Sequence, residues 1–298
     1  MKKILVIGSI NMDITTVTSR MPKIGETIVG ESFSTQPGGK GANQAVAIAK
    51  LGGNVKFFGA LGNDLYGKRL AENLSSNNVE FCGVVIEDIP SGTAVITVVE
   101  GDNCIILNPG ANDCVTPDMI KKNEKLFEEA DYVLMQLEIP VESVLTAAKL
   151  AKAHGCTVIV NPAPYKELPG EIYDYIDMIV PNEHEAESMT GIYPEDEESC
   201  KKAIEALLSK GIKSAAVTLG SKGSVYSMNG SLVFTPAKKV KAVDTTAAGD
   251  TFIGGMLTYL SMDKTMEEAV KFGTAASAIT VTRLGAADSI PSAEEVRI

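Results

Sequence analysis

The sequence lacks several features that would assign it to a functional class at once. Its five cysteines are odd in number and show no C-x-x-C spacing, so neither a disulfide framework nor a zinc site is indicated. No apolar run approaches the ~20 residues of a membrane-spanning helix. The apolar run after Met1-Lys-Lys is too short for a signal peptide. We therefore expect a cytoplasmic protein with no membrane partner.

Positive charge is also scarce. The chain has 27 Lys and Arg against 38 Asp and Glu, a net charge of -11. No block of basic residues could neutralise a run of phosphates, so a small molecule is favoured over nucleic acid as the partner. The 298 residues, 45% of them hydrophobic, are enough to bury one large core.

From about residue 116 onward, strand-like apolar runs alternate with amphipathic helical stretches. The pattern predicts strands at residues 132–137, 157–160, 178–180 and 215–219, and helices at residues 141–154 and 197–210. This order is typical of βαβ units, so we predict an α/β fold around a mainly parallel sheet.

Polar residues follow the predicted strands. The carboxyl ends of parallel strands lie at one edge of the sheet, where ligands of open α/β sheets bind. Each such residue could also be an ordinary turn-former, since Asn and Asp favour strand ends. The residues expected at this edge are Asn11, Asp13, Glu138, Asn161, Asn182, Gly220, Asp244 and Asp250.

Two segments, residues 14–36 and 91–108, break the alternation and show the period-2 pattern of antiparallel strands, with a hairpin turn at residues 101–103. We predict that they form a small sheet projecting from a core of residues 1–13, 37–90 and 109–298. Such a sheet could be a lid that excludes water. An insertion that serves only dimerisation is the alternative, and the two are compatible. A second hairpin is predicted to turn at Asn229-Gly230.

The most informative motif is Asp244-Thr-Thr-Ala-Ala-Gly-Asp250, between a strand-like run at residues 240–243 and a helical pattern that continues through Phe252. Unpaired amides in the first turn of a helix form a pocket for anionic oxygens. A carboxylate there would repel phosphate, so we interpret Asp250 as the acceptor of a proton from an incoming hydroxyl, as phosphoryl transfer requires. A capped helix with an ordinary first-turn acid is the alternative at this point.

A second motif, Gly38-Gly-Lys-Gly-Ala-Asn43, precedes an Ala-rich helical stretch at residues 44–51. Its glycines let backbone approach a ligand closely, and Asn43 offers both a donor and an acceptor to neighbouring hydroxyl groups, as a sugar needs. The pattern G-x-x-x-x-G-K-[ST] is absent, and so is G-x-G-x-x-G after the first strand. Both absences argue against a P-loop NTPase or a dinucleotide-binding enzyme.

Over essentially its whole length the chain resembles the ribokinase (pfkB-type) family of carbohydrate kinases. Besides the two motifs above, the resemblance rests on Gly8-Ser-Ile-Asn-Met-Asp13, Met135-Gln-Leu-Glu138, Asn161-Pro-Ala-Pro164, Pro181-Asn-Glu-His-Glu185, Thr218-Leu-Gly-Ser-Lys-Gly223 and Val281-Thr-Arg-Leu-Gly285. It implies a three-layer αβα fold with a mainly parallel sheet and a small projecting β-sheet lid. It also implies a homodimer through the lid sheets.

The activity that the resemblance implies is that of a phosphotransferase with an alcohol group as acceptor. The favoured reaction is ATP-dependent phosphorylation of D-ribose at its 5-hydroxyl to give D-ribose 5-phosphate and ADP. The alternatives are the same chemistry on deoxyribose, fructose or adenosine, and a non-catalytic sensor of sugar and nucleotide.

The resemblance also implies a role for each residue of the site. Asp250 would be the base, and Ala247, Ala248 and Gly249 would offer amides to the γ-phosphate. The sugar would be held by Asn11, Asp13, Gly39, Lys40, Gly41, Asn43 and Glu138. The nucleotide would contact Asn182, Glu185, Thr218, Gly220, Ser221, Gly223, Gly249 and Thr274.

Two cations are implied as cofactors. Mg²⁺ would accompany ATP, with Glu185 acting through water. An activating monovalent cation, usually K⁺, would be bound by the Asp244 side chain, the Ser289 hydroxyl and the carbonyls of Thr246, Thr280, Arg283 and Gly285.

Two residues depart from the family pattern. Ala247 stands where many relatives carry glycine, so the predicted site requires this position to keep a negative φ. Thr274 stands where some relatives place His or Asn beside the adenine, which leaves the base selectivity open.

Overall fold

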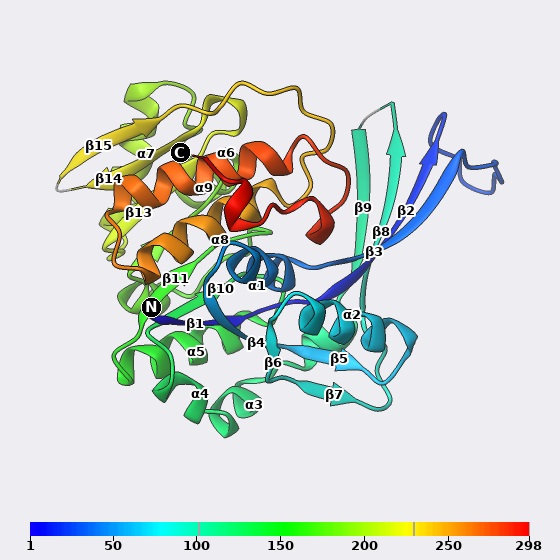
Figure 1. Ribbon diagram of the computed structural model, residues 1–298, viewed down its shortest axis with the longest axis horizontal. Helices are drawn as coiled ribbons and strands as arrows, with labels where there is room; N and C mark the ends of the chain where they lie inside the picture. Colours follow the sequence, from blue (N-terminus) through cyan, green and yellow to red (C-terminus); the bar gives the residue numbers. More distant parts are fainter. Residues whose placement is uncertain (101, 229, 298) are drawn as a thin grey trace.

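The computed structural model describes residues 1–100, 102–228 and 230–297. A nine-stranded sheet in the order β15-β14-β13-β12-β11-β10-β1-β4-β6 forms its centre (Figure 1). Strands from β6 to β13 are parallel, whereas β14 and β15 pair antiparallel. The strands are β1 (Lys3–Ile7), β4 (Asn54–Phe58), β6 (Glu80–Phe81), β10 (Tyr132–Met135), β11 (Thr157–Val160), β12 (Met178–Ile179), β13 (Ser214–Thr218), β14 (Ser224–Met228) and β15 (Ser231–Thr235).

Helices cover both faces of this sheet because each buried strand points alternate apolar side chains to opposite sides. In β1, Leu5 and Ile7 belong to one apolar cluster, and Ile4 and Val6 to the other. The first cluster includes residues of α3 (Pro117–Lys122), α4 (Lys125–Glu128), α5 (Val141–Ala153), α6 (Glu183–Thr190) and α7 (Glu197–Ser209). The second includes α1 (Lys40–Lys50), α2 (Leu65–Ser76), α8 (Ala248–Ser261) and α9 (Met266–Thr280). The predicted three-layer αβα fold is confirmed.

A four-stranded sheet in the order β3-β2-β8-β9 projects from the core (Figure 1). Its strands are β2 (Asn11–Thr18), β3 (Ser32–Gly38), β8 (Gly92–Val99) and β9 (Asp102–Asn108). Its first two strands extend beyond the predicted segment 14–36 at both ends, so Asn11 and Asp13 lie on β2, whereas the second segment ends at Asn108 as predicted. The small sheet is also not wholly antiparallel, because its central strands β2 and β8 run parallel. Two further short strands, β5 (Ala60–Gly62) and β7 (Val84–Ile86), pair with each other.

Most of the elements predicted from periodicity are present. α5 and α7 each end one residue before the predicted bound, and β11 has the predicted bounds. Gly101 and Asn229, which the two predicted hairpin turns include, lie outside the described residues. No helix in the described ranges is both long enough and apolar enough to cross a membrane.

The predicted strand at residues 240–243 is wrong. The chain there is irregular, and the side chains of Val240 and Val243 are 46% and 56% exposed. Val243 N donates to Val281 O at 2.7 Å, but this contact is to the segment after α9 and not to a strand. Valines favour a strand only where a neighbouring strand can pair with them and bury them, and here that neighbour is missing.

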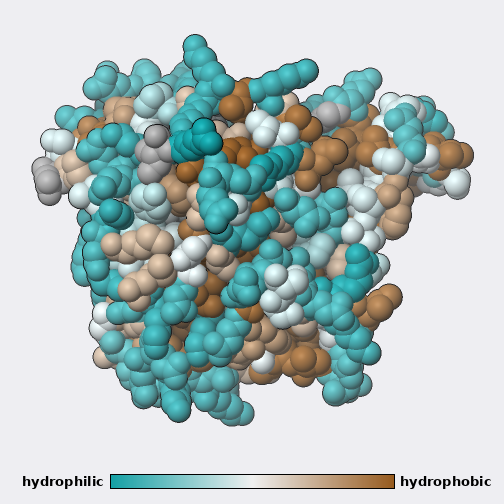
Figure 2. Space-filling model, in the orientation of Figure 1, coloured by the Kyte–Doolittle hydropathy of each residue, from teal (hydrophilic) through white to brown (hydrophobic). Residues whose placement is uncertain are grey.

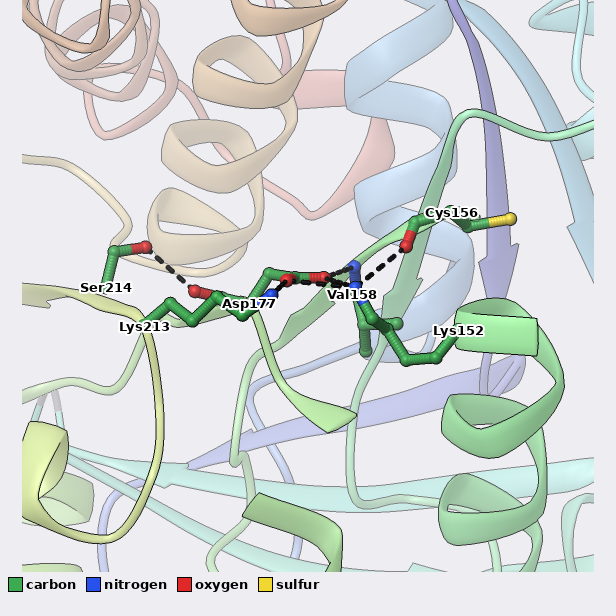
Figure 3. Close-up of polar contacts among 6 residues, drawn as sticks. All are labelled: Lys152, Cys156, Val158, Asp177, Lys213 and Ser214. Carbon is green, nitrogen blue, oxygen red and sulfur yellow. Dashed lines mark hydrogen bonds and ion pairs between the residues drawn. The ribbon is translucent and has the colours of Figure 1, made fainter. Parts of the chain in front are cut away.

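The amino ends of three core strands are tied together at Asp177, just before β12 (Figure 3). Its carboxylate accepts from Lys152 Nζ at 2.8 Å, Lys213 Nζ at 2.6 Å and Val158 N at 2.8 Å. Its carbonyl accepts from Ser214 N and Ser214 Oγ, both at 3.0 Å. Burial would raise the pKa of Asp177, but the hydrogen bonds from the two lysines and Val158 outweigh it and lower the pKa. This cluster fastens the sheet at the edge opposite the predicted site.

We predict that Asp177→Asn lowers the free energy of unfolding at pH 7 by about 1–3 kcal/mol, the weight of hydrogen bonds to a charged group. Because folding lowers this pKa, the stabilisation is complete above the unfolded value of 3.8 and is lost as the pH falls through the folded-state pKa. Denaturant unfolding of parent and variant should therefore differ at pH 7 and converge below pH ~4.

The matched control is Asp118→Asn, which removes an exposed carboxylate 3.7 Å from Lys121 Nζ. It should leave the unfolding midpoint unchanged, since exposed pairs contribute little. Equal midpoints for Asp177→Asn and the parent at pH 7 would show that the cluster does not fasten the strands.

Candidate active site

The amino ends of α1 and α8 meet at the Asp250 carboxylate. Asp250 lies in the first turn of α8 and is 8% exposed. Asn43 Nδ2 donates to its Oδ2 at 3.3 Å, and Gln44 Nε2 donates to its Oδ1 at 2.9 Å. The structure thus joins Asp250 to the predicted sugar residue Asn43. It adds Gln44, to which the sequence analysis assigned no role.

The first turn of α8 offers unpaired amides on the exposed side of Asp250. Gly249 is exposed, and no described oxygen accepts a hydrogen bond from Gly249 N or Asp250 N. Ala248 N, in contrast, donates to Thr245 O at 3.2 Å. Two amides of this turn are therefore available to an anionic oxygen, and the predicted contribution of Ala248 would require the loss of its bond to Thr245.

The predicted requirement of a negative φ at Ala247 is wrong. Ala247 precedes α8 with φ 58° and ψ 10°, the left-handed conformation. An L-residue pays about 1–2 kcal/mol for it. The carbonyl of Ala247 accepts from both Thr251 N at 2.8 Å and Thr251 Oγ1 at 2.9 Å. Helix capping therefore fixes this turn and overrides the preference of alanine.

The predicted sugar residues converge from three elements. Glu138, just after β10, accepts from Lys40 N at 3.1 Å and from the Ser9 hydroxyl. Asn11, at the start of β2, is paired with Gly38 at the end of β3. Between β3 and α1 stands Gly39 with φ 89°, where a Cβ would come within 2.7 Å of Asn11 N. Glycine is required at this crossing because both the left-handed φ and the close backbone contact exclude a side chain.

Several charged groups face one another across this site. Burial, then repulsion from the Glu138 and Asp250 carboxylates, raises the pKa of Asp13 to about 7. Burial would lower the pKa of the Lys40 ammonium, but the facing carboxylates of Asp250, Glu138, Glu185 and Asp13 outweigh it and raise the pKa. The Lys40 ammonium is therefore within electrostatic reach of both the predicted sugar residues and the predicted nucleotide residue Glu185.

Asn112 is a site residue that the sequence analysis missed. It is 1% exposed and belongs to the short 3-10 helix Gly110–Cys114 after β9. Its Oδ1 accepts from Ile10 N at 3.0 Å, and its Nδ2 donates to Asn11 Oδ1 at 2.7 Å. This bond turns the Asn11 amide so that its Nδ2 is left for another partner. The contact spans 101 residues of sequence, so no local pattern could reveal it.

A hollow of 170 Å³ opens at this place. Its lining contains two of the predicted sugar residues together with Asn112. The lining residues are Asn11, Leu107, Asn108, Pro109, Asn112, Asp113, Glu138, Pro164 and Lys166.

Apart from Gly249 on α8, the predicted nucleotide residues lie along the ends of β12 and β13 and on α9. Asn182 and Glu185 form a capping box at α6, with Asn182 N donating to Glu185 Oε2 at 2.9 Å. Burial is the main cause of a raised pKa at Glu185. Thr218 N donates to Pro181 O at 3.0 Å, which places the turn Gly220–Lys222, with Ser221 at its centre and Gly223 just after it, beside Asn182. Thr274 Oγ1, on α9, is buried and has no hydrogen-bond partner among the described residues.

A second hollow, of 270 Å³, lies beside α9. It contains none of the predicted site residues. Its lining residues are Lys238, Val240, Ala275, Ala278, Ile279, Thr282, Glu295 and Arg297.

Three of the six predicted ligands for a monovalent cation are joined directly. Asp244 Oδ1 accepts from Thr246 N at 2.9 Å, and its Oδ2 accepts from Gly285 N at 2.9 Å. Burial would raise the pKa of Asp244, but the hydrogen bonds from Thr246 and Gly285 outweigh it and lower the pKa. Asp244 is therefore a charged anchor between the segment before α8 and the segment after α9.

The other three predicted ligands lie in the segment that ends α9 and follows it. Thr280 O accepts from Arg283 N at 3.0 Å, and Ser289 Oγ donates to Ala286 O at 2.7 Å. Within the described ranges, no three His, Cys, Asp or Glu side chains cluster as a metal site. The predicted monovalent-cation site differs from such a cluster, since five of its six ligands are carbonyl or hydroxyl oxygens and only Asp244 supplies a carboxylate.

Comparison with known proteins gives one consistent family. The description "pfkB family carbohydrate kinase" matches residues 1–293. Ribokinase of Haemophilus influenzae is 40% identical over 296 residues, covering 99% of this chain and 97% of the relative. Deoxyribokinase of Salmonella typhi is 36% identical over 297 residues, covering 98% and 96%. The structure of Arabidopsis thaliana ribokinase complexed with ribose and ATP has a TM-score of 0.93 at 35% identity, covering 98% and 96%.

Proposed function

The chain belongs to the pfkB family of carbohydrate kinases, and we propose that it transfers the γ-phosphoryl group of ATP to the 5-hydroxyl of D-ribose, giving D-ribose 5-phosphate and ADP. One observation carries this proposal. Asp250 lies in the first turn of α8, beside two unpaired amides, and Asn43 bonds the oxygen of its carboxylate that is not held by Gln44. A base and an anion pocket are thus adjacent, as transfer to a hydroxyl requires.

The acceptor sugar is held by groups that match its hydroxyls. Carboxylates accept hydrogen bonds from hydroxyl groups, and Asp13, Glu138 and Asp250 supply three of them around one space. The Nδ2 of Asn11, directed by Asn112, donates to a hydroxyl oxygen. Resemblance to ribokinases, including the one whose structure contains ribose and ATP, supports ribose as the substrate. Deoxyribose remains the nearest alternative because of the 36% identical deoxyribokinase.

In the reaction, Asp250 takes the proton of the sugar 5-hydroxyl. The 5-oxygen of the sugar attacks the γ-phosphorus, and the bond between this phosphorus and ADP breaks. The amides of Gly249 and Asp250 stabilise the negative charge on the transferring group. The Lys40 ammonium is within electrostatic reach of both the sugar side and Glu185, so it would lie near the phosphates.

The residues present fit a hydrated Mg²⁺ that accompanies ATP. Glu185 is 8% exposed, and one oxygen of its carboxylate is held by Asn182 N, which leaves Oε1 for a coordinated water. When bound, the ion neutralises phosphate charge. The capping box of α6, in which Asn182 N donates to Glu185 Oε2, holds the Glu185 carboxylate in place.

We test this function by ADP release from ATP with D-ribose, 2-deoxyribose, fructose and adenosine. D-ribose should give the highest kcat/KM. Strong turnover of adenosine with none of ribose would overturn the substrate assignment. The Asp250→Asn variant should bind ribose and ATP within a few-fold of the parent and lose about 10²–10⁴-fold in kcat, the usual contribution of a general base.

The control for this variant is Asp263→Asn, which changes an exposed acid just beyond the end of α8. Its kcat should equal that of the parent. A nearly full rate for Asp250→Asn would point to a different base or to a sensor without catalysis.

We also propose that K⁺ binds at the Asp244 carboxylate, the Ser289 hydroxyl and the carbonyls of Thr246, Thr280, Arg283 and Gly285. Oxygen ligands suit a hard, singly charged ion. The Asp244 segment leads directly into the first turn of α8, so the ion would hold the anion pocket in place.

Replacing K⁺ by tetramethylammonium should lower kcat about tenfold or more, because small displacements of catalytic groups are costly. ATP affinity should change by only a few-fold. The Asp244→Asn variant should lose its response to K⁺. Equal rates of the parent in the two salts would contradict the cation site.

The small sheet supports a homodimer in which the outer faces of two lids pack together. Ile14, Val95 and Ile106 are partners across β2, β8 and β9 and therefore share the face opposite that of Asp13. Val95 and Ile106 are 40% and 67% exposed, and Phe33 on the same face is 68% exposed. Figure 2 shows apolar side chains gathered over this projecting sheet. A second copy of the chain would cover this face, because an exposed apolar patch favours association and a two-fold dimer pairs the same patch of both subunits.

Ile106→Glu should weaken self-association by about 30-fold or more, the effect expected at the centre of an interface. Sedimentation velocity over a range of concentrations measures it. Phe234→Glu, at an exposed apolar position on β15 away from the small sheet, should leave association unchanged. A parent that sediments as a monomer at all concentrations would refute the dimer.

A further inference from the structure

A chain of buried amide side chains ends on the carboxylate of Asp250. Gln44 is 0% exposed, and its Nε2 donates both to Asp250 Oδ1 at 2.9 Å and to Asn161 Oδ1 at 3.0 Å. Gln136, also 0% exposed, donates its Nε2 to Gln44 Oε1. Asn161 Nδ2 in turn donates to Val180 O at 2.8 Å. Every polar atom of the Gln44 amide is thus bonded.

These residues come from separate elements of the core. Gln136, Asn161 and Val180 follow β10, β11 and β12, at the carboxyl edge of the parallel sheet, while Gln44 lies on α1. One glutamine side chain therefore connects three strand ends to the base on α8. Because these strands are buried in the core, their hydrogen bonds to Gln44 fix the position of the Asp250 carboxylate.

The direction of the chain is set by the charge at its end. A carboxylate only accepts, so Gln44 must turn its Nε2 toward Asp250 and its Oε1 toward Gln136. Gln136 then donates its own Nε2, and its Oε1 is left buried without a partner in the described part of the chain. This oxygen is packed against the Gly8 backbone, where an added Cβ would come within 2.1 Å of it. An unpaired buried oxygen is costly. In this series of hydrogen-bonded amides it lies on Gln136, which is separated from Asp250 by Gln44.

We propose that Gln44 is a positioning residue for phosphoryl transfer: it engages Oδ1 of Asp250 so that Oδ2 faces the acceptor hydroxyl and receives its proton. This inference rests on the proposed function. Oδ2 accepts only the longer 3.3 Å bond from Asn43 Nδ2, so it has capacity for a second donor. In the step, the sugar O–H bond breaks, the proton moves to Oδ2, and the oxygen bonds the γ-phosphorus as the bond to ADP breaks.

The test compares Gln44→Met with the parent, because methionine has a similar volume and cannot donate. We expect kcat to fall about 10–100-fold, part of the contribution of a general base, while KM for ribose changes by less than about threefold. Loss of a donor to a carboxylate favours its protonated form, so the acid limb of the kcat–pH profile should move to higher pH. Lys40, Asp13 and Glu185 also face Asp250 and are the same in both proteins.

Gln44→Glu is the second variant, since it keeps the shape and replaces the donor with an acid beside Asp250. Like charges oppose ionisation of both groups, so its acid limb should move further than that of Gln44→Met. In whichever of the two variants folds, a fall in kcat with KM for ribose within about threefold of the parent indicates a positioning role, and an unchanged kcat contradicts it.

The matched control is Thr258→Val. Thr258 is 0% exposed, and its Oγ1 donates to Gly254 O at 2.8 Å and lies 3.4 Å from Ile48 O, so it is at the contact of α8 with α1, but two turns away from Asp250. It should cost stability and leave kcat and the pH profile unchanged. If the folded Gln44 variants behave like Thr258→Val, Gln44 is only structural. If the parent itself releases no ADP with ribose, the proposed function fails, which is a separate result.

Discussion

Two amide-to-carboxylate hydrogen bonds, from Asn43 and Gln44 to Asp250, are the contact on which the site depends. They join the amino end of α1, which follows the small sheet, to the amino end of α8, which carries the unpaired amides. They place the base between the sugar residues and the anion pocket. The bonds bring the acceptor and the transferring group to one place, where orientation supplies much of the rate of phosphoryl transfer.

The same contact explains why so much negative charge is tolerated in one small space. Asp13, Glu138 and Asp250 face one another, and the raised pKa of Asp13 reflects both burial and this repulsion. Lys40 and the amide donors of Asn43 and Gln44 offset part of the cost. The remaining acceptor capacity matches a substrate rich in hydroxyl donors. Hydrogen bonds from the sugar hydroxyls would relieve this repulsion among the carboxylates, and the relief would strengthen sugar binding.

Local patterns in the sequence are enough to predict the layers of the fold and the position of Asp250. The periodicities that define α5, α7 and β11 are local, and helix opening at α8 follows from small residues before an apolar face. Contacts distant in sequence decide the rest. Residues 240–243 look like a strand but lack a neighbour, and Ala247 is held at positive φ by its bonds to Thr251. Asn112 and Gln44 act through partners 101 and 206 residues away, which no spacing rule can find.

The most direct measurement is a crystal structure with D-ribose and a non-hydrolysable ATP analogue. The account places the 5-hydroxyl oxygen at hydrogen-bond distance, about 2.6–3.2 Å, from Asp250 Oδ2, with a γ-phosphate oxygen on the amides of Gly249 and Asp250. A complex in which that hydroxyl contacts Asp13 or Glu138 instead, with the γ-phosphate away from the first turn of α8, would contradict it.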